Sequence, residues 1–451
     1  MISLILSLVV LLVGYAVYSR VTEKVFSPDD RATPAIAIND GVDCVPMKPW
    51  RAFLIQLLNI AGTGPIFGAL MGACFGPVVF LWIVFGSILG GAVHDYMSGM
   101  ISSRHGGASI AELSGVYLGT AAKWVMRIFS VILLILCGTV FVTSPAALIS
   151  QLLHQLSPES GSFFLSGTFW IVVILIVMAL GVLGGTIFGG YTIPEITQGV
   201  NHPQGLPVWP FMFVTVACGA ISGFHATQSP MIAKCITSER QGRKIFYGAM
   251  ITESVIALIW AAAGVAFYGG AYLLNEALSS AGPSSVVLEI SRTMLKSIGG
   301  VLAVIGVVVC PITSGDTAFR SARLILAEIT HLEQKKIRNR LIITLPLLAV
   351  GALLTQLDFN VLWRYFSWSN QTLAMISLWV ATAYLLKNGK KQSMSLLTAL
   401  PATFMSAVSM TYILMAGEGF GLSSVIAYPA GAAFAAILFA VYIVAVAKKR
   451  K

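Results

Sequence analysis

The sequence predicts an all-α, polytopic membrane bundle, and three observations support this fold class. Of the 451 residues, 57% are hydrophobic and only 10% are charged, too few charges for the surface of a water-soluble chain of this length. Apolar runs recur along the whole length, and many approach the ~20 residues that a helix needs to cross a bilayer core. Basic residues gather in short segments between those runs. We therefore expect a single integral membrane domain over residues 1–451.

The net charge of +10 follows the positive-inside pattern, in which lysine and arginine concentrate in cytoplasmic loops. The basic clusters are Arg20, Lys24 and Arg31; Arg104; Lys234, Arg240, Arg243 and Lys244; Lys335, Lys336, Arg338 and Arg340; Lys387, Lys390 and Lys391; and the closing KKRK. With every cluster in the cytoplasm, the N-terminus is expected outside and the C-terminus inside. We expect the lipid bilayer as a partner and no nucleic acid.

Apolar runs mark the expected spans in chain order. Read with a window of about 19 residues, they fall near 2–18, 52–75, 78–100, 125–150, 165–188, 208–231, 246–274, 298–316, 341–357, 363–386, 395–415 and 424–446. The first run lacks the positive start and the cleavage site of a secretory signal, so we interpret it as a retained anchor. The six cysteines form no CxxC pair, and the sequence predicts neither a disulfide framework nor a zinc site.

The number of spans conflicts with the expected positions of the termini. An external N-terminus and an internal C-terminus require an odd number of crossings, whereas the apolar runs give twelve. The conflict lies between Ala146 and Val208, where "GTFWIVVILIVMALGVLGG" offers only one crossing. Our hypothesis is that a turn and parts of two helices are missing near residues 172–178. A re-entrant segment through "GGYTIPEITQGV" is the alternative.

Two spans contain residues that break helices. They are "IAGTGPIFG", residues 60–68, and "CGAISGFHATQSPM", residues 218–231. Glycine costs a helix interior about 1 kcal/mol and proline removes a backbone hydrogen bond. Unwound backbone at membrane depth is tolerated where it lines a cavity, and a pair of such spans in corresponding positions is typical of a transporter site. Glycines that merely allow close helix packing are the alternative.

Counting spans from the two breaks predicts a five-plus-five inverted repeat of the LeuT type. If the missing hairpin restores one crossing, each break begins a set of five helices, and the two sets have opposite orientations. Residues 1–50 then form an N-terminal helix and a cytoplasmic loop. The first repeat covers 51–206, the second covers 207–390, and two extra helices occupy 391–451.

Polar residues at the two breaks are the candidates for binding substrate. We expect a substrate carboxylate to meet the amide groups of half-helix N-termini there. The candidates are Gly62, Thr63, Gly64, Pro65, Gly219, Ser222, Gly223, His225 and Gln228. His225 is expected to contact substrate or to carry a proton, because histidine titrates near physiological pH; a packing role is the alternative.

Two carboxylates inside spans are candidates for ion coupling together with His225. Asp95 is costly at membrane depth and is therefore a functional candidate. A structural ion pair with Arg104 near the cytoplasmic face is an alternative of equal weight. Glu253 would carry a coupling proton if it is desolvated, whereas a glutamate near the membrane interface would need no functional role. No Walker A, GxSxG or HExxH motif is present, and we do not expect an enzyme.

Hydroxyl groups at the inner end of a later span form a possible ion site. Thr313 and Ser314 could offer oxygen ligands to a hard cation such as sodium. Asp316 and Arg320 stand four residues apart, and we favour a helical ion pair for them.

Six ordered blocks of the sequence resemble the signature blocks of the carbon starvation protein A family. They are "DDRATPAIAINDGVDCVPMKPW", "IAGTGPIFGAL", "GGAVHDYMSGMISSRHGGASIAEL", "ACGAISGFHATQSP", "TSGDTAFRSAR" and "LWRYFSWSNQTLA". The resemblance covers most of the chain, which looks like one of the shorter members of the family. The chain departs from the family pattern at 170–184, where the family has more residues.

The resemblance implies a secondary transporter with a five-plus-five core in a prokaryotic inner membrane, active in uptake of peptides or pyruvate when carbon is limiting. By motif, Gly62, Gly64 and Pro65 would form the first break, and Gly219, Ser222, Gly223 and His225 the second. Thr313 and Ser314 would be candidates for sodium coordination. We expect no cofactor besides a coupling ion, H⁺ or Na⁺. A membrane sensor or regulatory subunit that binds the same solute without moving it is the alternative.

Overall fold

The computed structural model of the chain describes residues 1–41, 43–153, 180–199, 201–304, 310–334 and 336–450. Every regular element in these ranges is a helix. The main helices are α1 (Ile2–Phe26), α2 (Pro34–Ala37), α3 (Pro49–Ile60), α4 (Gly64–Ala73), α5 (Val78–Leu81), the π-helix η1 (Trp82–Gly91), α6 (Ala92–Arg104), α7 (Ile110–Leu118), α8 (Thr120–Leu153), α10 (Val208–Thr215), α11 (Gly223–Ala233), α12 (Gly248–Phe267), α13 (Ala271–Val304), α14 (Cys310–Thr330), α15 (Ile337–Leu354), α16 (Phe359–Asn388), α17 (Leu396–Met415) and α18 (Ser424–Arg450). The all-α prediction is confirmed.

Seven stretches of the described chain are long and apolar enough to cross a membrane. They are Ile2–Phe26, Val78–Arg104, Thr120–Phe141, Glu239–Phe267, Ile337–Leu354, Gln392–Met415 and Ser424–Lys449, and the bent pair α3 and α4 qualifies as an eighth. The expected span 208–231 is divided between α10 and α11. The hypothesis of missing residues near 172–178 concerns a segment that lies outside the described residues.

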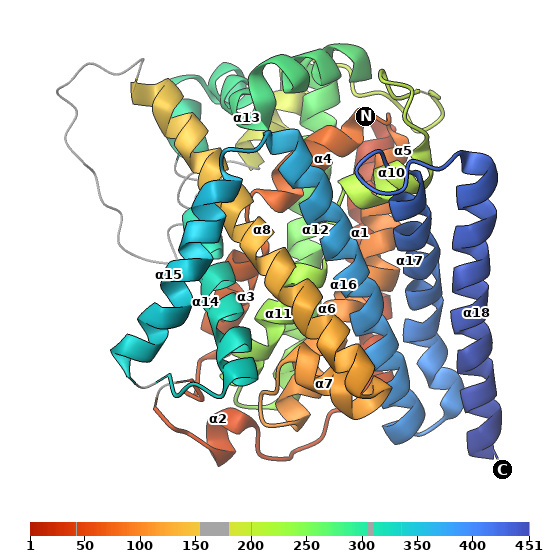
Figure 1. Cartoon of the computed structure of the whole chain (residues 1–451). Coiled ribbons are helices and arrows are strands. Elements are labelled where there is room, and N and C mark those ends of the chain that lie inside the picture. Colours follow the sequence, from red (N-terminus) through yellow and green to blue (C-terminus); the bar gives the residue numbers. More distant parts are fainter. Residues whose placement is uncertain (42, 154–179, 200, 305–309, 335, 451) are drawn as a thin grey trace.

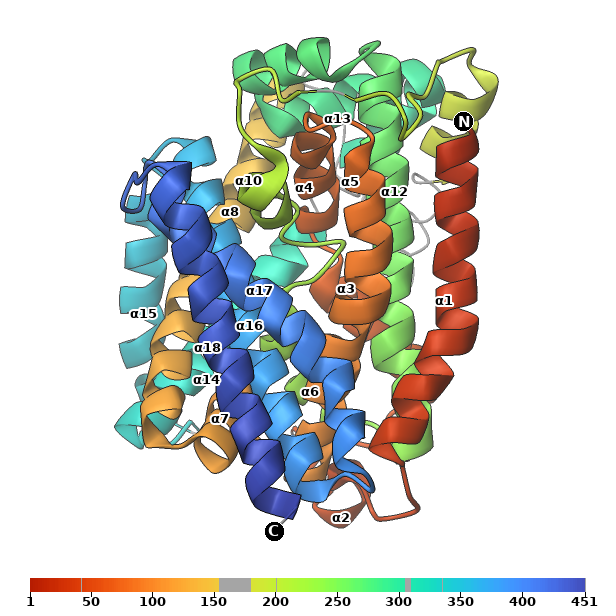
Figure 2. The same ribbon diagram turned by 90° about the vertical axis from the view of Figure 1, so that its right-hand side faces the viewer.

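The two termini lie at opposite ends of the bundle, as an odd number of crossings requires (Figures 1 and 2). The helix α13 lies across the end that carries the N-terminus. At the other end, Lys449 donates to the carbonyl of Lys387, and Arg104 and Arg240 are both engaged in ion pairs with the acidic segment before α2. We call this end of the bundle, where the basic clusters of the sequence meet, the basic end.

The core of the bundle is formed by helices that are buried nearly all round. The helix α12 packs against α1, α3, α4 and η1, and most of its residues are buried. The helix α11 packs against α3, α6 and α16, and all but one of its residues are buried. By contrast, α1, α15 and α18 carry exposed apolar side chains along much of their length, which suits a lipid-facing perimeter. The two helix breaks therefore lie against the most buried part of the fold.

Candidate functional site

The first predicted break is present between α3 and α4. The helix α3 ends at Ile60, α4 begins at Gly64, and the two axes are bent by 49°. Pro65 lies in the first turn of α4, where its missing N–H leaves no hydrogen bond unmade. The hydroxyl of Thr63 is fully buried and has no hydrogen-bond partner among the described residues. The break therefore offers free polar groups at the start of a half-helix.

The second predicted break separates α10 from α11. The helix α10 ends at Thr215 and α11 begins at Gly223, so seven residues between them are non-helical. Gly219 has φ of 89°, a conformation that favours glycine. Ser222 is the N-cap residue of α11, and the half-helix begins with Gly223 and His225 in its first turn. Ser222 therefore does not share a helical face with His225 and Ser229, as an unbroken helix would have required.

Two adjacent side chains of α16 satisfy the backbone groups freed by the second break. Asn370 accepts a hydrogen bond from the backbone N–H of Phe224 at 2.7 Å and donates to the carbonyl of Ala217 at 2.8 Å. Gln371 donates to the carbonyls of Phe213 and Val216 at 3.1 and 3.3 Å. Because both side chains are fully buried, these bonds fix the unwound segment against α16.

The two breaks lie in direct contact, with glycines at the points of closest approach. A Cβ atom placed on Gly64 would lie 2.6 Å from Sγ of Cys218, closer than real atoms approach. A Cβ on Gly219 would lie 2.6 Å from that of Ala257 on α12 and 3.7 Å from Cα of Pro65. The two breaks therefore touch, and two of the predicted glycines are required by packing.

Four ionisable side chains from three helices meet beside the second break. His225 on α11 donates from Nδ1 to Oδ2 of Asp95 on α6 at 2.8 Å. His94 donates from Nδ1 to the other oxygen, Oδ1, at 2.8 Å. On the opposite side of the ring, His225 Nε2 lies 3.4 Å from Oε2 of Glu253 on α12. All four side chains have no exposed surface, and we call them the carboxylate–histidine cluster.

The cluster resolves two alternatives that the sequence left open. Arg104 does not pair with Asp95; its partner is Glu239, with Nε of Arg104 at 2.8 Å from Oε1. Glu253 does not lie at an interface but in the core, next to His225. His94 was not among the predicted site residues, because neighbouring helical residues point about 100° apart. The imidazole reaches sideways to its neighbour, and the dipeptide His-Asp at membrane depth was the available signal.

The cluster brings two buried carboxylates together with two histidines. It contains two carboxylates, and histidines are the only basic side chains with which they form ion pairs in the described ranges. Both oxygens of Glu253 and Nε2 of His225 lack a hydrogen-bond partner among the described residues. A buried charge is stable only when it is paired. The arrangement is therefore suited to taking up a cation.

Other predicted site residues lie away from the cluster. Gln228 donates to Ser321 on α14 at 3.4 Å and to its neighbour Thr227. Ser314 donates to the carbonyl of Leu58 at 3.2 Å, and its hydroxyl oxygen would lie 3.3 Å from a Cβ on Gly62. Ser314 therefore lies beside the first break, whereas the side chain of Thr313 lies outside the described residues. The predicted sodium site stays a prediction.

The charges near Ser314 are arranged differently from the expected helical pair. Arg320 pairs with Asp43, with 3.4 Å between Nη2 and Oδ1, and Asp316 is exposed. The segment before α3 is thereby tied to α14.

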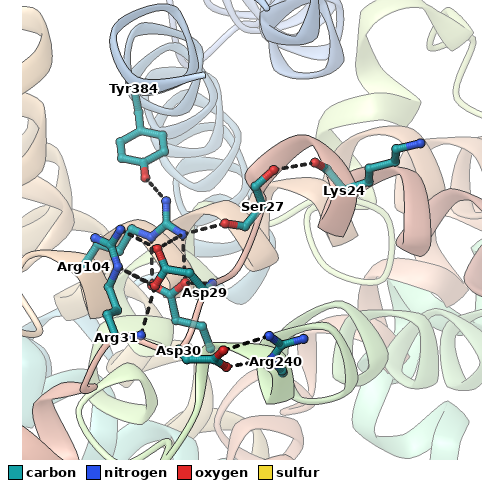
Figure 3. Close-up of polar contacts among 9 residues, drawn as sticks. Lys24, Ser27, Asp29, Asp30, Arg31, Arg104, Arg240 and Tyr384 are labelled. Carbon is teal, nitrogen blue, oxygen red and sulfur yellow. Dashed lines mark hydrogen bonds and ion pairs between the residues drawn. The ribbon is translucent and has the colours of Figure 1, made fainter. Parts of the chain in front are cut away.

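A second polar network joins four segments at the basic end (Figure 3). Arg104 makes two 2.8 Å hydrogen bonds to the carboxylate of Glu239, which is 1% exposed, and donates to Tyr384 and to the carbonyl of Ser27. Asp29 lies at the same place, and its hydrogen bonds with Arg31 hold the pKa of that carboxyl well below its usual range. Arg104 and Asp95 both belong to α6, nine residues or about 14 Å apart along the axis. The network and the cluster are thus joined by one helix.

Comparison with known proteins places the chain among membrane transporters. The family model described as carbon starvation protein CstA matches residues 1–187, 163–282 and 277–412. A membrane protein of Haemophilus influenzae is 38% identical over 60% of this chain and 92% of its own length. A Bacillus subtilis relative named peptide transporter CstA is 25% identical over 89% of this chain and 88% of its own length. The Escherichia coli pyruvate/proton symporter BtsT is 29% identical over 56% of this chain, and the match spans 47% of BtsT.

Proposed function

Because this chain belongs to the carbon starvation protein CstA family, we propose that it imports a small carboxylate-bearing nutrient, a peptide or pyruvate, through a prokaryotic inner membrane when carbon is limiting. Relatives named as a peptide transporter and as a pyruvate/proton symporter support this substrate class. The observation that carries the proposal is the contact between two broken helices beside a buried cluster of carboxylates and histidines. That combination belongs to ion-coupled carriers rather than to passive helix bundles.

We assign substrate binding to the two breaks. The helices α4 and α11 begin at Gly64 and Gly223, and the positive ends of their helix dipoles would attract a carboxylate there. Thr63 supplies a buried hydroxyl without a described partner, which could hydrogen-bond the same ligand. The substrate carboxylate would therefore lie between the first turns of the two half-helices.

We assign ion coupling to the carboxylate–histidine cluster. Its two buried carboxylates would take up a cation, H⁺ or Na⁺, and His225 belongs to the same first turn that we assign to the substrate. Binding of the anionic substrate beside the cluster would raise its affinity for the cation, because opposite charges in a buried site strengthen each other. By linkage, the cation would raise the affinity for substrate by the same factor.

Alternating access about the two breaks would carry the substrate across. A five-plus-five inverted repeat over residues 51–206 and 207–390 would allow one set of helices to rock against the other around the fixed site. The Arg104–Glu239 network holds the basic end together and would have to open when the site faces that side. The mechanism therefore predicts that this network forms and breaks once in each transport cycle.

Uptake into proteoliposomes tests the proposal. The purified chain is reconstituted, labelled pyruvate or a labelled dipeptide is added, and proton and sodium gradients are imposed in separate experiments. Accumulation of one solute above its external concentration, under one gradient only, would establish an ion-coupled carrier and identify the ion. Binding without accumulation under either gradient would favour a solute-binding sensor or regulatory subunit. Mere equilibration would favour a passive pathway.

A further inference from the structure

We propose that Cys218, His225 and Glu253 form a binding site for a divalent transition-metal ion of the zinc and cobalt class. This inference goes beyond the proposed function and does not depend on it. Ligand atoms of the three side chains lie within 4.8 Å of one another, and all three residues are buried. They come from the non-helical segment before α11, from α11 itself and from α12, so no spacing in the sequence could reveal them.

The spacing of the ligand atoms suits a tetrahedral ion. Metal–ligand bonds of about 2.0–2.3 Å place neighbouring ligands of a tetrahedral zinc roughly 3.3–3.8 Å apart. Nε2 of His225 and Oε2 of Glu253 are already 3.4 Å apart. The remaining separations are at most 4.8 Å, so a small inward rotation of side chains completes the site. Three protein ligands leave a fourth position for water or another ligand.

The surroundings of His225 prepare it as a metal ligand. Its Nδ1 donates to Asp95 at 2.8 Å, which orients the ring and leaves the lone pair of Nε2 pointing at Glu253. A carboxylate on the far nitrogen of a metal-bound histidine is the usual outer partner in such sites. His94 holds the other oxygen of Asp95. The support that a bound ion requires is therefore already formed.

Unsatisfied atoms favour an ion at this place. Nε2 of His225 and both oxygens of Glu253 make no hydrogen bond with the described residues, and the contact between Nε2 and Oε2 is a 3.4 Å ion pair that an ion could bridge. A metal ion would occupy all three side chains at once, with the thiol proton of Cys218 released to solvent. A set of sulfur, nitrogen and oxygen ligands selects zinc-like ions over sodium or magnesium, which prefer oxygen alone.

The test is a titration of the purified full-length chain with cobalt(II), followed by absorption spectroscopy. Thiolate-bound cobalt gives an intense near-ultraviolet charge-transfer band, and tetrahedral cobalt gives strong visible bands. We expect both to saturate at one cobalt per chain and to vanish when zinc(II), which is colourless and takes the same ligands, is added. Because the ligands are buried, each addition is followed until the absorbance is constant.

Four variants identify the ligands. Cys218→Ser should abolish the charge-transfer band, whereas Cys74→Ser, which replaces another thiol with 1% exposure, should leave it unchanged. Glu253→Gln should weaken cobalt binding at least tenfold. Asp95→Asn, which changes only the outer partner, should lower the affinity by about 10–100-fold but keep the band at saturation. Size-exclusion elution of each variant shows that it is folded.

The inference is overturned if native protein gives no thiolate band, or if Cys218→Ser keeps it. Neither result touches the proposed function, because the readout needs no substrate and no gradient. Conversely, a chain that binds cobalt but transports nothing would support the metal site while the transport proposal fails.

Discussion

His225 donates its Nδ1 hydrogen to Asp95 over 2.8 Å in a place where neither side chain has exposed surface. The bond joins α11, which begins at the second break, to α6, which runs to the Arg104 network at the basic end. The second break, the carboxylate–histidine cluster and the Arg104 network are thereby connected through two helices. The predictions below follow from this connection.

Asp95→Asn should slow gradient-driven uptake while preserving the shape of the side chain. A hydrogen bond to a charged group contributes about 1.5–3 kcal/mol, so we expect a fall of roughly tenfold or more in the rate at low substrate concentration. The measurement is initial uptake into proteoliposomes. Asp30→Asn is the control, because Asp30 is 81% exposed at the basic end; equal loss in both variants would refute the role of Asp95.

Asn370→Ala should destabilise the second break. The change leaves the buried N–H of Phe224 and the carbonyl of Ala217 without their partner, at about 1–3 kcal/mol each. We expect a lower melting temperature and a higher KM, since the start of α11 is no longer held in place. Asn360→Ala, at an exposed position of the same helix, should change neither value. An unchanged KM in Asn370→Ala would show that α16 does not position the break.

Gly64→Ala should impair transport through a steric clash between the two breaks. The added Cβ would lie 2.6 Å from Sγ of Cys218, so one half-helix must move. We expect uptake to fall at least tenfold, and the double variant Gly64→Ala/Cys218→Gly to recover part of the loss. Gly417→Ala, where nothing lies within 4 Å of the new atom, is the control. Full activity in Gly64→Ala would mean that the breaks need not touch.

Arg104→Met should lower stability far more than Arg240→Met. Arg104 pairs with Glu239, whose side chain is 1% exposed, and removing one partner of a buried pair costs about 3–5 kcal/mol. Arg240 pairs with Asp30 in solvent, with 65% and 81% exposure, where a pair contributes about 0–1 kcal/mol. Thermal unfolding in detergent compares them. Similar melting temperatures for the two variants would show that the Arg104 network does not hold the basic end together.

The sequence was most informative where the signal is local. Glycine and proline at Gly62–Pro65 and Gly219–Gly223 predicted both breaks, because their backbone preferences act within a few residues. The high cost of charge in a membrane likewise singled out Asp95 and Glu253. Their partners could not be predicted, since His225 lies 130 residues from Asp95 and only the folded bundle brings three helices together.

The same limit explains the errors. Arg104 was the nearest base to Asp95 in sequence, yet it bonds Glu239, 135 residues away. The position of Ser222 relative to His225 could not be predicted, because the pattern does not show at which residue α11 begins. Cys218 was not predicted as a ligand, because its neighbours His225 and Glu253 belong to other elements.

The most direct test of the central claim compares two measurements on Glu253→Gln in proteoliposomes: gradient-driven accumulation, and exchange of labelled for unlabelled substrate without a gradient. If the carboxylate–histidine cluster couples an ion to transport, the ratio of accumulation to exchange should fall at least tenfold relative to the native chain, because the binding site persists while the charge that holds the ion is gone. Glu276→Gln, on the solvent-facing part of α13, serves as the control. An unchanged ratio in Glu253→Gln would contradict the account.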